Sequence, residues 1–242
     1  MTTYTTVADS NGDFIVPFST EYSSGEKVTV TAEKDGAIKT IELFAPSEVT
    51  GGGVIQFSGT LNDFPNNVGV VEFSADINGS IASYGFYTNP ANRNFGYYAT
   101  GLKLNGVTLI DALAFYGWEN AKTLELPETL TRIQLGAFQN WKALQTLVIP
   151  NSVTRLDDAA FRDCTVLSSV TIGTNVSYIG SAFYQCSSLM NITCLAPTPP
   201  QLDGSALAGV PVTCNIFVPE SALNLYKSAP SWSARASYIQ AI

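Results

Sequence analysis

The chain has 242 residues, a net charge of −8 and a charged fraction of 13%, about half that of an ordinary soluble domain. It contains no histidine, which excludes a serine–histidine–aspartate triad, a cysteine–histidine dyad and a histidine-based zinc site. The acidic balance argues against a nucleic-acid partner, because binding to phosphates requires a basic patch.

The N-terminal residues Met1–Val7 lack the basic and apolar segments of a secretory signal peptide. No window approaches the ~18 consecutive apolar residues of a membrane-spanning helix, so no membrane span is expected. The composition is nevertheless rich in Ser, Thr, Asn and Gly, as in extracellular proteins. Two explanations remain open. The protein is assembled in the host cytoplasm into a particle released by lysis, as phage virion proteins are, or an export signal lies upstream of Met1.

Residues 1–48 are predicted to form a small antiparallel β module. Turn signals separate an alternating run at Val28–Ala32 from a β-rich run at Ile38–Phe44. Residues 1–50 hold eight acidic and three basic residues, so most of the net charge lies here. Asp9–Asp13 is similar to a calcium loop, but Thr20 stands where the bidentate Glu is needed. A tight turn is therefore the better interpretation, and no metal site is predicted.

The segment Ala8–Val16, taken with Val28–Ala32, resembles the ends of bacterial Ig-like modules in adhesins and phage tail proteins. Only about half of such a sandwich is present. We therefore expect the module to pack on the rest of the chain, on another copy of itself or on a host structure. Residues 49–66, which include a Gly-rich stretch, are interpreted as a linker.

Residues 84–98 mix six aromatic residues with Asn, Gly and one Arg. Such residues are typical of adaptable binding loops that stack on sugars or anchor in a protein pocket. The alternative is an irregular capping unit whose aromatic side chains close the end of a repeat array. The candidate binding residues are Tyr84, Phe86, Tyr87, Asn92, Arg93, Phe95, Tyr97 and Tyr98.

A repeat of about 23 residues follows. The pair Ala-Phe recurs with Phe115, Phe138, Phe161 and Phe183, and Leu207 continues the column. Other apolar columns keep the same phase, and Pro127, Pro150 and Gly173 share a turn column. Phe86 precedes Phe115 by 29 residues, so membership of Phe86 in the column requires about six inserted residues. Each unit predicts a short strand, a turn, a second apolar pair and a short helical turn around Ala-Phe. The strands are predicted at Thr123–Leu126, Thr146–Ile149 and Ser169–Ile172. Because one unit cannot bury its apolar face alone, stacked units form a solenoid.

The pattern L-x-x-L-x-I-P-x-S-V-T-x-L-x-x-x-A-F-x-x-C over Leu144–Cys164 resembles the BspA-like leucine-rich repeats. Residues 197–242 resemble the terminal cap of that family. The resemblance implies a strand-lined solenoid over residues 67–242 and, commonly, adhesion or binding at a cell surface. It implies no catalytic residues and no cofactor. The predicted fold class is thus a β-rich α/β protein with a small N-terminal antiparallel β module, a leucine-rich-repeat solenoid and a C-terminal cap.

The strands of the repeat alternate apolar and polar residues, so the polar residues should point outward. A solenoid often binds ligands on such a face, although an ordinary solvated sheet is an equally good interpretation. The outward residues are Thr123, Glu125, Thr146, Val148, Ser169, Thr171, Asn191 and Thr193.

The position three residues after each repeat Phe holds Trp118, Trp141, Cys164, Cys186 and Val210. A disulfide or metal site is one interpretation of the two thiols, but the matching Trp and Val favour a buried apolar column. Cys194 and Cys214 are near enough to the C-terminal cap to approach each other. The adjacent Asp157 and Asp158 are interpreted as solvated, because nothing indicates the facing carboxyl groups of a glycosidase.

These features together predict a non-enzymatic binding protein. The main hypothesis is a tail- or fibre-associated component of a phage or prophage virion that recognises a host surface glycan or outer-membrane protein. Residues 1–48 would attach it to other virion proteins, and homo-oligomers are possible. A bacterial BspA-like surface adhesin and a capsid decoration protein without a ligand are the alternatives. The predicted location is the virion, or the bacterial cell surface under the adhesin alternative.

Overall fold

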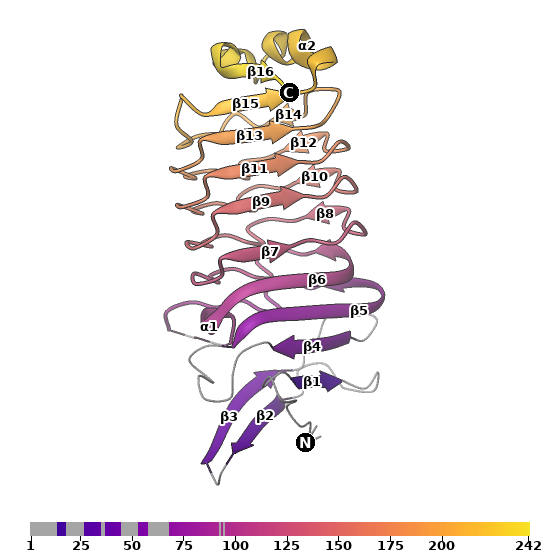
Figure 1. Ribbon diagram of the computed structural model, residues 1–242, viewed down its shortest axis with the longest axis vertical. Helices are drawn as coiled ribbons and strands as arrows, with labels where there is room; N and C mark the ends of the chain where they lie inside the picture. The colour runs from indigo at the N-terminus through magenta and orange to yellow at the C-terminus, as the bar shows by residue number, and fades with distance from the viewer. Residues whose placement is uncertain are drawn as a thin grey trace.

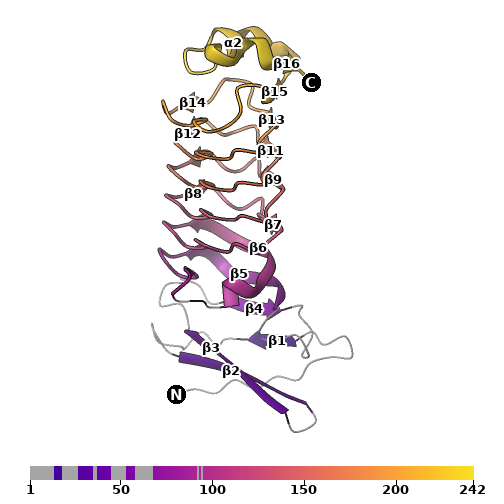
Figure 2. The ribbon, with the colours of Figure 1, turned by 90° about the vertical axis from the view of Figure 1, so that its left-hand side faces the viewer.

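The computed structural model describes residues 14–17, 27–34, 37–44, 53–57, 68–91, 93 and 95–242. From residue 69 onward, these residues form a stack of coils in which each turn of the chain lies on the previous one (Figures 1 and 2). The coils are lined by parallel strands on two sides, as expected for a solenoid. The predicted leucine-rich-repeat architecture is therefore confirmed for this part of the chain.

The first coils are made from two long strands, β5 (Gly69–Ile81) and β6 (Ala99–Ile110), which pair in parallel. Strand β6 pairs through its first half with the short strand at residues 123–125. Through its second half it pairs with the short strand at residues 132–133. Beyond β6, each coil contributes one strand to each side. One side holds β7 (Thr123–Glu125), β9 (Thr146–Ile149), β11 (Ser169–Ile172), β13 (Asn191–Cys194) and β15 (Asn215–Val218). The other side holds β8 (Arg132–Ile133), β10 (Arg155–Leu156), β12 (Tyr178–Ile179) and β14 (Gln201–Leu202).

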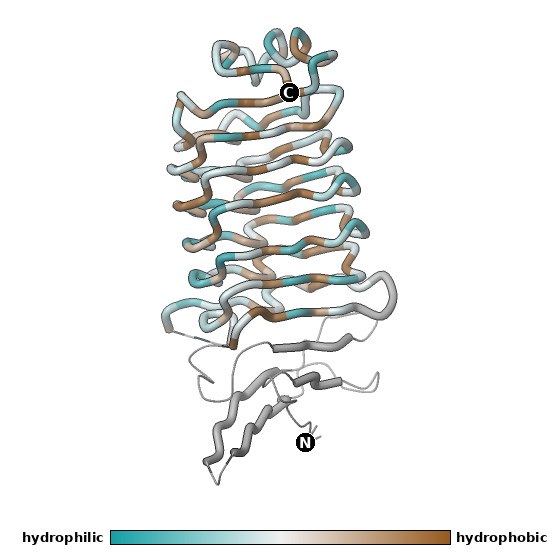
Figure 3. The backbone as a smooth tube through the Cα atoms, in the orientation of Figure 1, coloured by the Kyte–Doolittle hydropathy of each residue, from teal (hydrophilic) through white to brown (hydrophobic). Residues whose placement is uncertain are grey.

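The core consists of the apolar columns that the 23-residue repeat places in register. Val170 of β11 lies opposite Leu147 of β9 and Ile192 of β13, and all three are buried. The rings of Phe115, Phe138, Phe161 and Phe183 are also buried and stack one above the other, with centroids 5.2–5.8 Å apart. Figure 3 shows hydrophobic residues recurring within every coil while hydrophilic residues gather at the turns. Each coil therefore buries its apolar side chains only because its neighbours cover them.

The segment around each Ala-Phe pair forms a turn and contains no helix, which corrects the predicted helical turn. The backbone explains the difference, since left-handed residues stand two positions before and two after Phe115, Phe138 and Phe161, and two positions after Phe183. Around Phe138 these residues are Gly136, with φ 61°, and Asn140, with φ 66°. A right-handed helix cannot pass through such positions. At Gly117, in the same column as Asn140, an added Cβ would lie 2.1 Å from the Thr88 carbonyl oxygen, so only glycine fits.

At the N-terminal end, strand β1 (Phe14–Pro17) pairs antiparallel with β4 (Gly53–Phe57), and β4 pairs antiparallel with β5. Strands β2 (Lys27–Lys34) and β3 (Ala37–Phe44) form a separate hairpin. The runs at Val28–Ala32 and Ile38–Phe44 are thus strands, as predicted. Strand β4, however, lies inside the predicted linker 49–66 and joins the sheet of the coils. The predicted division into a module and a linker stays a prediction, and the resemblance to Ig-like modules finds no support. The turn predicted at Asp9–Asp13 lies outside the described residues.

The C-terminal residues follow the last coil with three short helices, η1 (Glu220–Ala222), α2 (Leu223–Ser228) and η2 (Ser233–Tyr238), and strand β16 (Ile239–Ala241). Tyr226 and Trp232 are buried. The Tyr226 hydroxyl donates to the Ala196 carbonyl at 2.8 Å, and the Trp232 Nε1–H donates to the Pro200 carbonyl at 2.8 Å. In the part of the chain that the structure describes, no helix has the length and apolar character needed to cross a membrane.

Candidate functional site

One candidate surface is the outer side of β7, β9, β11, β13 and β15, which we call the strand face (Figure 1). The predicted alternation is confirmed, because every second residue along these strands is buried and the others are exposed or half-buried. The side chain of Val148 is 62% exposed. Whether these residues bind a ligand stays a prediction. The exposed members are Thr123, Glu125, Thr146 and Val148, and the half-buried members are Ser169, Thr171, Asn191 and Thr193.

Charge on the strand face is confined to its N-terminal end. Lys103 of β6 lies 3.0 Å from Glu72 of β5 and in register with Glu125 of β7. The hydrogen bond with Glu72 raises the pKa of Lys103. From Thr146 to β15 the outward residues are hydroxyl, amide or apolar. The Asn215 side chain donates to Asn191 at 3.5 Å, which continues the uncharged row toward the C-terminal end.

The aromatic segment 84–98 divides into a buried and an exposed part. Phe86 is only 5% exposed, and its ring stacks on Phe115 with centroids 5.3 Å apart. It therefore belongs to the phenylalanine column, and the prediction of an insertion after it is correct. Phe86 cannot contact a ligand, so its assignment as a binding residue is wrong. It instead closes the column, as the capping interpretation predicts.

The exposed part of this segment centres on Tyr84, which is 60% exposed. The rings of Tyr84 and Tyr87 lie 5.6 Å apart, and Tyr87 stacks on Tyr116 at 4.7 Å. The Asn140 amide donates to the Tyr116 hydroxyl at 2.8 Å. We call Tyr84, Tyr87 and Tyr116 the tyrosine cluster. Tyr116 was not among the predicted residues, although it follows Phe115 as Tyr87 follows Phe86.

The remaining predicted residues of the segment lie in and before helix α1 (Phe95–Tyr98). The Arg93 guanidinium lies over the Tyr97 ring, 4.2 Å from its centroid. Tyr97 and Tyr98 meet edge to face at 5.3 Å, and Tyr98 packs partly against the core. Asn92 lies outside the described residues, and the side chain of Phe95 is likewise not described.

The column three residues after each Phe is a buried stack, as its matching Trp residues indicate. The Trp118 and Trp141 rings lie parallel at 5.8 Å. The Trp141 Nε1–H donates to the Phe115 carbonyl at 2.8 Å, and the Cys186 thiol donates to the Phe161 carbonyl at 3.2 Å. All four cysteines are free and buried, so the disulfide interpretation is wrong. Burial raises the pKa of the Cys164 thiol, which keeps it protonated.

The two C-terminal cysteines are also unpaired. The Cys194 sulfur lies 3.1 Å from the Tyr226 hydroxyl oxygen, and burial raises the pKa of the thiol. Burial raises the pKa of Cys214 to about 11. Thiols act as nucleophiles and metal ligands in their ionised form, so both are poorly suited to either task. Within the described ranges, no cluster of three or more potential metal-binding side chains occurs.

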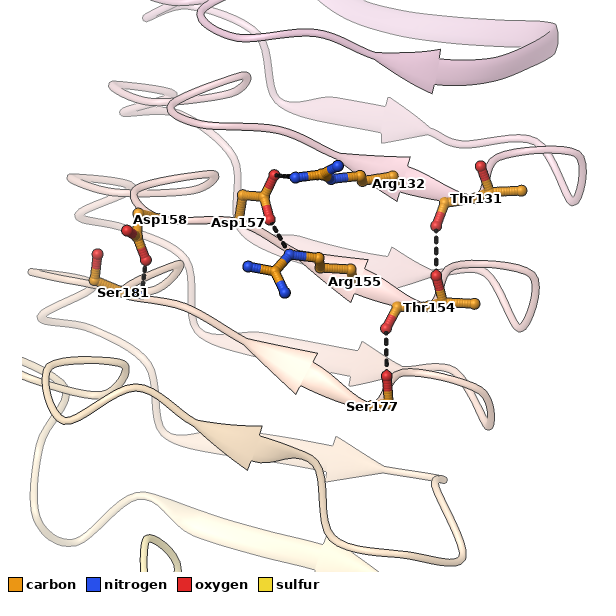
Figure 4. Close-up of polar contacts among 8 residues, drawn as sticks. All are labelled: Thr131, Arg132, Thr154, Arg155, Asp157, Asp158, Ser177 and Ser181. Atoms are coloured by element: carbon orange, nitrogen blue, oxygen red, sulfur yellow. Dashed lines mark hydrogen bonds and ion pairs between the residues drawn. The ribbon is translucent and has the colours of Figure 1, made fainter.

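The opposite side of the solenoid carries an ionic network that the sequence analysis missed (Figure 4). The Asp157 carboxylate is buried, and Arg132 of the preceding coil donates to it through two nitrogens, at 2.9 and 2.7 Å. Arg155 also donates to Asp157, and its guanidinium lies 3.9 Å from the centroid of the Tyr178 ring in the next coil. The prediction that Asp157 is solvated is therefore wrong. Asp158 is exposed, as predicted, and accepts a hydrogen bond from the Ser181 amide at 3.0 Å.

A column of hydroxyl groups lies beside this network. Thr154 donates to the carbonyl of Thr131, and Ser177 donates to the carbonyl of Thr154, each at 3.2 Å. Arg132, Arg155 and Tyr178 are separated by 23 residues each, so the spacing that revealed the core also contained this signal. The network joins three successive coils and engages its only buried carboxylate in ion pairs, which indicates a structural role.

The sequence matches the family described as the BspA type leucine rich repeat region, in six copies over residues 79–209. This range is more than half of the chain. The chain belongs to the BspA-type leucine-rich repeat family. No curated protein matches this BspA-type chain significantly.

Solved structures of several bacterial proteins are similar to this chain. The pneumococcal vaccine antigen PcpA is 20% identical, with 87% of this chain and 46% of that one covered and a TM-score of 0.53. The BspA-type chain thus spans less than half of the antigen's length. A Treponema pallidum (T. pallidum) leucine rich repeat protein is 21% identical over 57% of this chain and 68% of its own, with a TM-score of 0.44. A leucine rich cell surface protein from Faecalibacterium prausnitzii is 16% identical over 76% and 41%, with a TM-score of 0.39.

These comparisons bear on the two functional hypotheses differently. The predicted role in a phage virion receives no support from the family or from the similar structures. The alternative of a BspA-like surface adhesin fits the family better.

Proposed function

We propose that this BspA-type protein is a non-enzymatic binding protein of the bacterial cell surface, and that it contacts a protein partner through the strand face. The observation that carries the proposal is the uncharged row of outward residues on β9, β11 and β13, which the parallel pairing holds in register. The row contains no charged side chain, so no ion pair is needed to hold its residues in place.

The chemistry of the strand face suits adhesion to a protein. Thr171 and Thr193 present hydroxyl groups that donate or accept hydrogen bonds, and the exposed Val148 adds an apolar contact. Strands β11 and β13 pair with a strand on each side and β9 pairs with β11, so little conformational entropy is lost on binding. Solenoids commonly use such an extended surface for recognition. The absence of charge in the row makes binding depend on shape and hydrogen bonds and only weakly on salt.

We propose a capping role for residues 197–242 and no catalytic role for the chain. Tyr226 and Trp232 are buried and hydrogen bonded to carbonyls of the last coil, as a segment that closes a solenoid should be. The buried carboxylate of Asp157 is engaged by two arginines, and the four cysteine thiols are buried. Neither group offers an open nucleophile or general base.

The proposal is tested by coating inert beads with the purified protein and counting the beads that remain on cultured host epithelial cells after washing. We expect adhesion above that of albumin-coated beads. The double variant Val148→Lys/Thr171→Lys should reduce it by about ten-fold, because two buried charges would be left unpaired in the contact. The matched control is the double variant Thr165→Lys/Ser188→Lys, because both residues are exposed and lie outside the strands. Equal adhesion of the two variants, or no adhesion of the wild type, would refute the proposal.

The location is tested separately with an antibody raised against the protein. Cells of the producing bacterium are divided into envelope, cytoplasmic and released-particle fractions, and each is probed. We expect the protein in the envelope fraction and accessible to protease on intact cells. Recovery only in released particles would support the virion hypothesis and overturn the proposed location.

A further inference from the structure

We propose that the tyrosine cluster (Tyr84, Tyr87 and Tyr116) is a binding site for neutral carbohydrate, separate from the strand face. The cluster lies on the turns around Phe86 and Phe115, at the N-terminal end of the phenylalanine column. The inference does not depend on the strand face having a partner. It rests on the backbone, the exposure and the chemistry of these three residues.

The backbone conformation of Tyr84 first draws attention to the site. Its φ is 62°, in the left-handed region, and the corresponding residues of the next coils are Leu113, Gly136 and Ala159, with φ of 56–61°. The fold therefore imposes this conformation, which is strained for a bulky residue and suits glycine. Leu113 offsets the strain by packing beside Gly136. Tyr84 is 60% exposed, so burial does not offset its strain in the same way. A residue held under strain without burial is a candidate for function.

The cluster is held rigidly by the next coil. The backbone amides of Tyr84, Phe86 and Thr88 donate to the carbonyls of Ala112, Ala114 and Tyr116, at 3.0, 2.8 and 3.0 Å. The stacking of Tyr87 on Tyr116 and the bond from Asn140 to the Tyr116 hydroxyl fix the ring positions. A ligand would therefore meet a preformed surface, which lowers the entropic cost of binding.

The exposed chemistry fits a sugar. The face of an aromatic ring carries partial negative charge, so it attracts the polarised C–H groups on the flat side of a pyranose. Because Tyr116 accepts its hydrogen bond from Asn140, its own O–H proton can be donated to a sugar hydroxyl. The side chains that form the cluster and hold it are uncharged, so a neutral sugar meets no unpaired ion.

The size of the cluster favours a sugar over a protein. A stable protein interface covers about 800 Å² on each partner. A whole aromatic side chain supplies about 150–250 Å² when it is buried. Tyr87 and Tyr116 are already half-buried, so the three rings together expose well under a protein-sized area. One or two sugar rings match the surface that remains.

The test is affinity electrophoresis of the full chain in native gels that contain soluble dextran, laminarin, mannan or galactan, each a neutral polysaccharide. We expect retardation in at least one gel. The variant Tyr84→Ala/Tyr87→Ala should weaken binding by about ten-fold or more, whereas Tyr84→Phe, which keeps the ring, should stay within about three-fold. Tyr184→Ala is the matched control, because Tyr184 occupies the position of Tyr87 and Tyr116 in a later coil.

The outcomes separate this inference from the proposed function. Migration unaffected by all four polysaccharides, or retardation that the double alanine variant retains, would overturn the carbohydrate site. Loss of bead adhesion in that variant without any polysaccharide binding would assign the cluster to a protein partner instead, and would also overturn it. The melting temperature of each variant is measured in parallel. We expect little change for Tyr84→Phe, because Tyr84 is exposed, and a modest fall for the double alanine variant, because Tyr87 stacks on Tyr116. The strand-face variant Val148→Lys/Thr171→Lys should bind polysaccharide as the wild type does.

Discussion

Replacement of Phe138 by Ala tests whether the stacked phenylalanine column holds the solenoid together. Phe138 is fully buried between Phe115 and Phe161, at centroid distances of 5.5 and 5.2 Å, and meets Trp141 edge to face at 5.3 Å. Truncation of a buried Phe costs about 3–5 kcal/mol. Each aromatic pair adds about 0.5–1.5 kcal/mol beyond burial. Because three pairs are lost, we expect a cost near the upper end, about 4–5 kcal/mol.

Phe183→Ala is the control, because Phe183 is equally buried but stacks on Phe161 at 5.8 Å and has Leu207 on its other side. We expect this variant to lose about 3 kcal/mol, the lower end of the range. Both are measured by urea unfolding, followed by tryptophan fluorescence and by circular dichroism. Trp141 lies beside Phe138 and Trp232 lies beyond the last coil, so separated transitions would reveal uncoupled coils. A loss below about 2 kcal/mol for Phe138→Ala, or a loss no larger than that of Phe183→Ala, would refute the reasoning.

Three further predictions concern the network, the tryptophan column and the thiols. Asp157→Ala should lower the free energy of unfolding by about 1–3 kcal/mol. The loss should be smaller in high salt, because the two arginines that Asp157 engages are nearly half exposed. Chemical unfolding at two salt concentrations measures both effects. Trp141→Phe keeps the stack but leaves the buried Phe115 carbonyl without its indole donor, so a loss of about 1–3 kcal/mol is expected in the same assay, and a neutral result would contradict the role of that bond. Burial raises the pKa of Cys214 from 9.0 to about 11, and the pKa values of Cys194 and Tyr226 are also raised. The unfolded chain therefore loses these protons at lower pH than the folded chain, so the stabilisation is fully present below pH 9.0. Stability should fall above pH 9.0 for the two thiols and above pH 10.0 for Tyr226, by at most about 1.4 kcal/mol per pH unit for each group, and the contribution of Cys214 should be lost by about pH 11. Thermal melts across this range test the slope, and native-state labelling with a thiol reagent should stay slow until the protein unfolds.

The parts of the fold that the sequence predicts are those written into the spacing of apolar residues. A step of 23 residues from Phe115 to Phe138 leaves one stacked arrangement that buries both rings. The spacing left the membership of Phe86 open, because the step to Phe115 is 29 residues, and the stacked rings show that Phe86 belongs to the column. The strand bounds at Thr146–Ile149 follow from alternation, which the burial pattern repeats.

Other features carry no such signal in the sequence. The left-handed turns are occupied by mixed residue types, and members such as Leu113, Ala159 and Gln185 give no indication of a positive φ. The fold sets these angles through the stacking of the coils, so a helical turn was the natural but wrong prediction. The strand β4 was missed because its pairing with β5 is a long-range contact that no local pattern reveals.

The candidate sites divide in the same way. Alternation was enough to place Thr171 and Val148 on the outer side of the sheet. It could not show that Phe86 is buried while Tyr84 is exposed, because both stand in one irregular turn. The ion pairs of Asp157 were missed since its partner Arg132 comes from another coil, and a reading of neighbouring residues alone cannot find it.

The in-register columns also allow the length of the solenoid to change in fixed steps. Each coil from Phe115 to Phe183 repeats the same contacts with the coil before and the coil after it. Duplication or deletion of one whole coil would preserve every column while it moves the tyrosine cluster and the C-terminal helices apart or together by one strand spacing, about 4.8 Å. Recombination between repeats can therefore change the distance between the two ends in fixed steps, without any new kind of contact between coils.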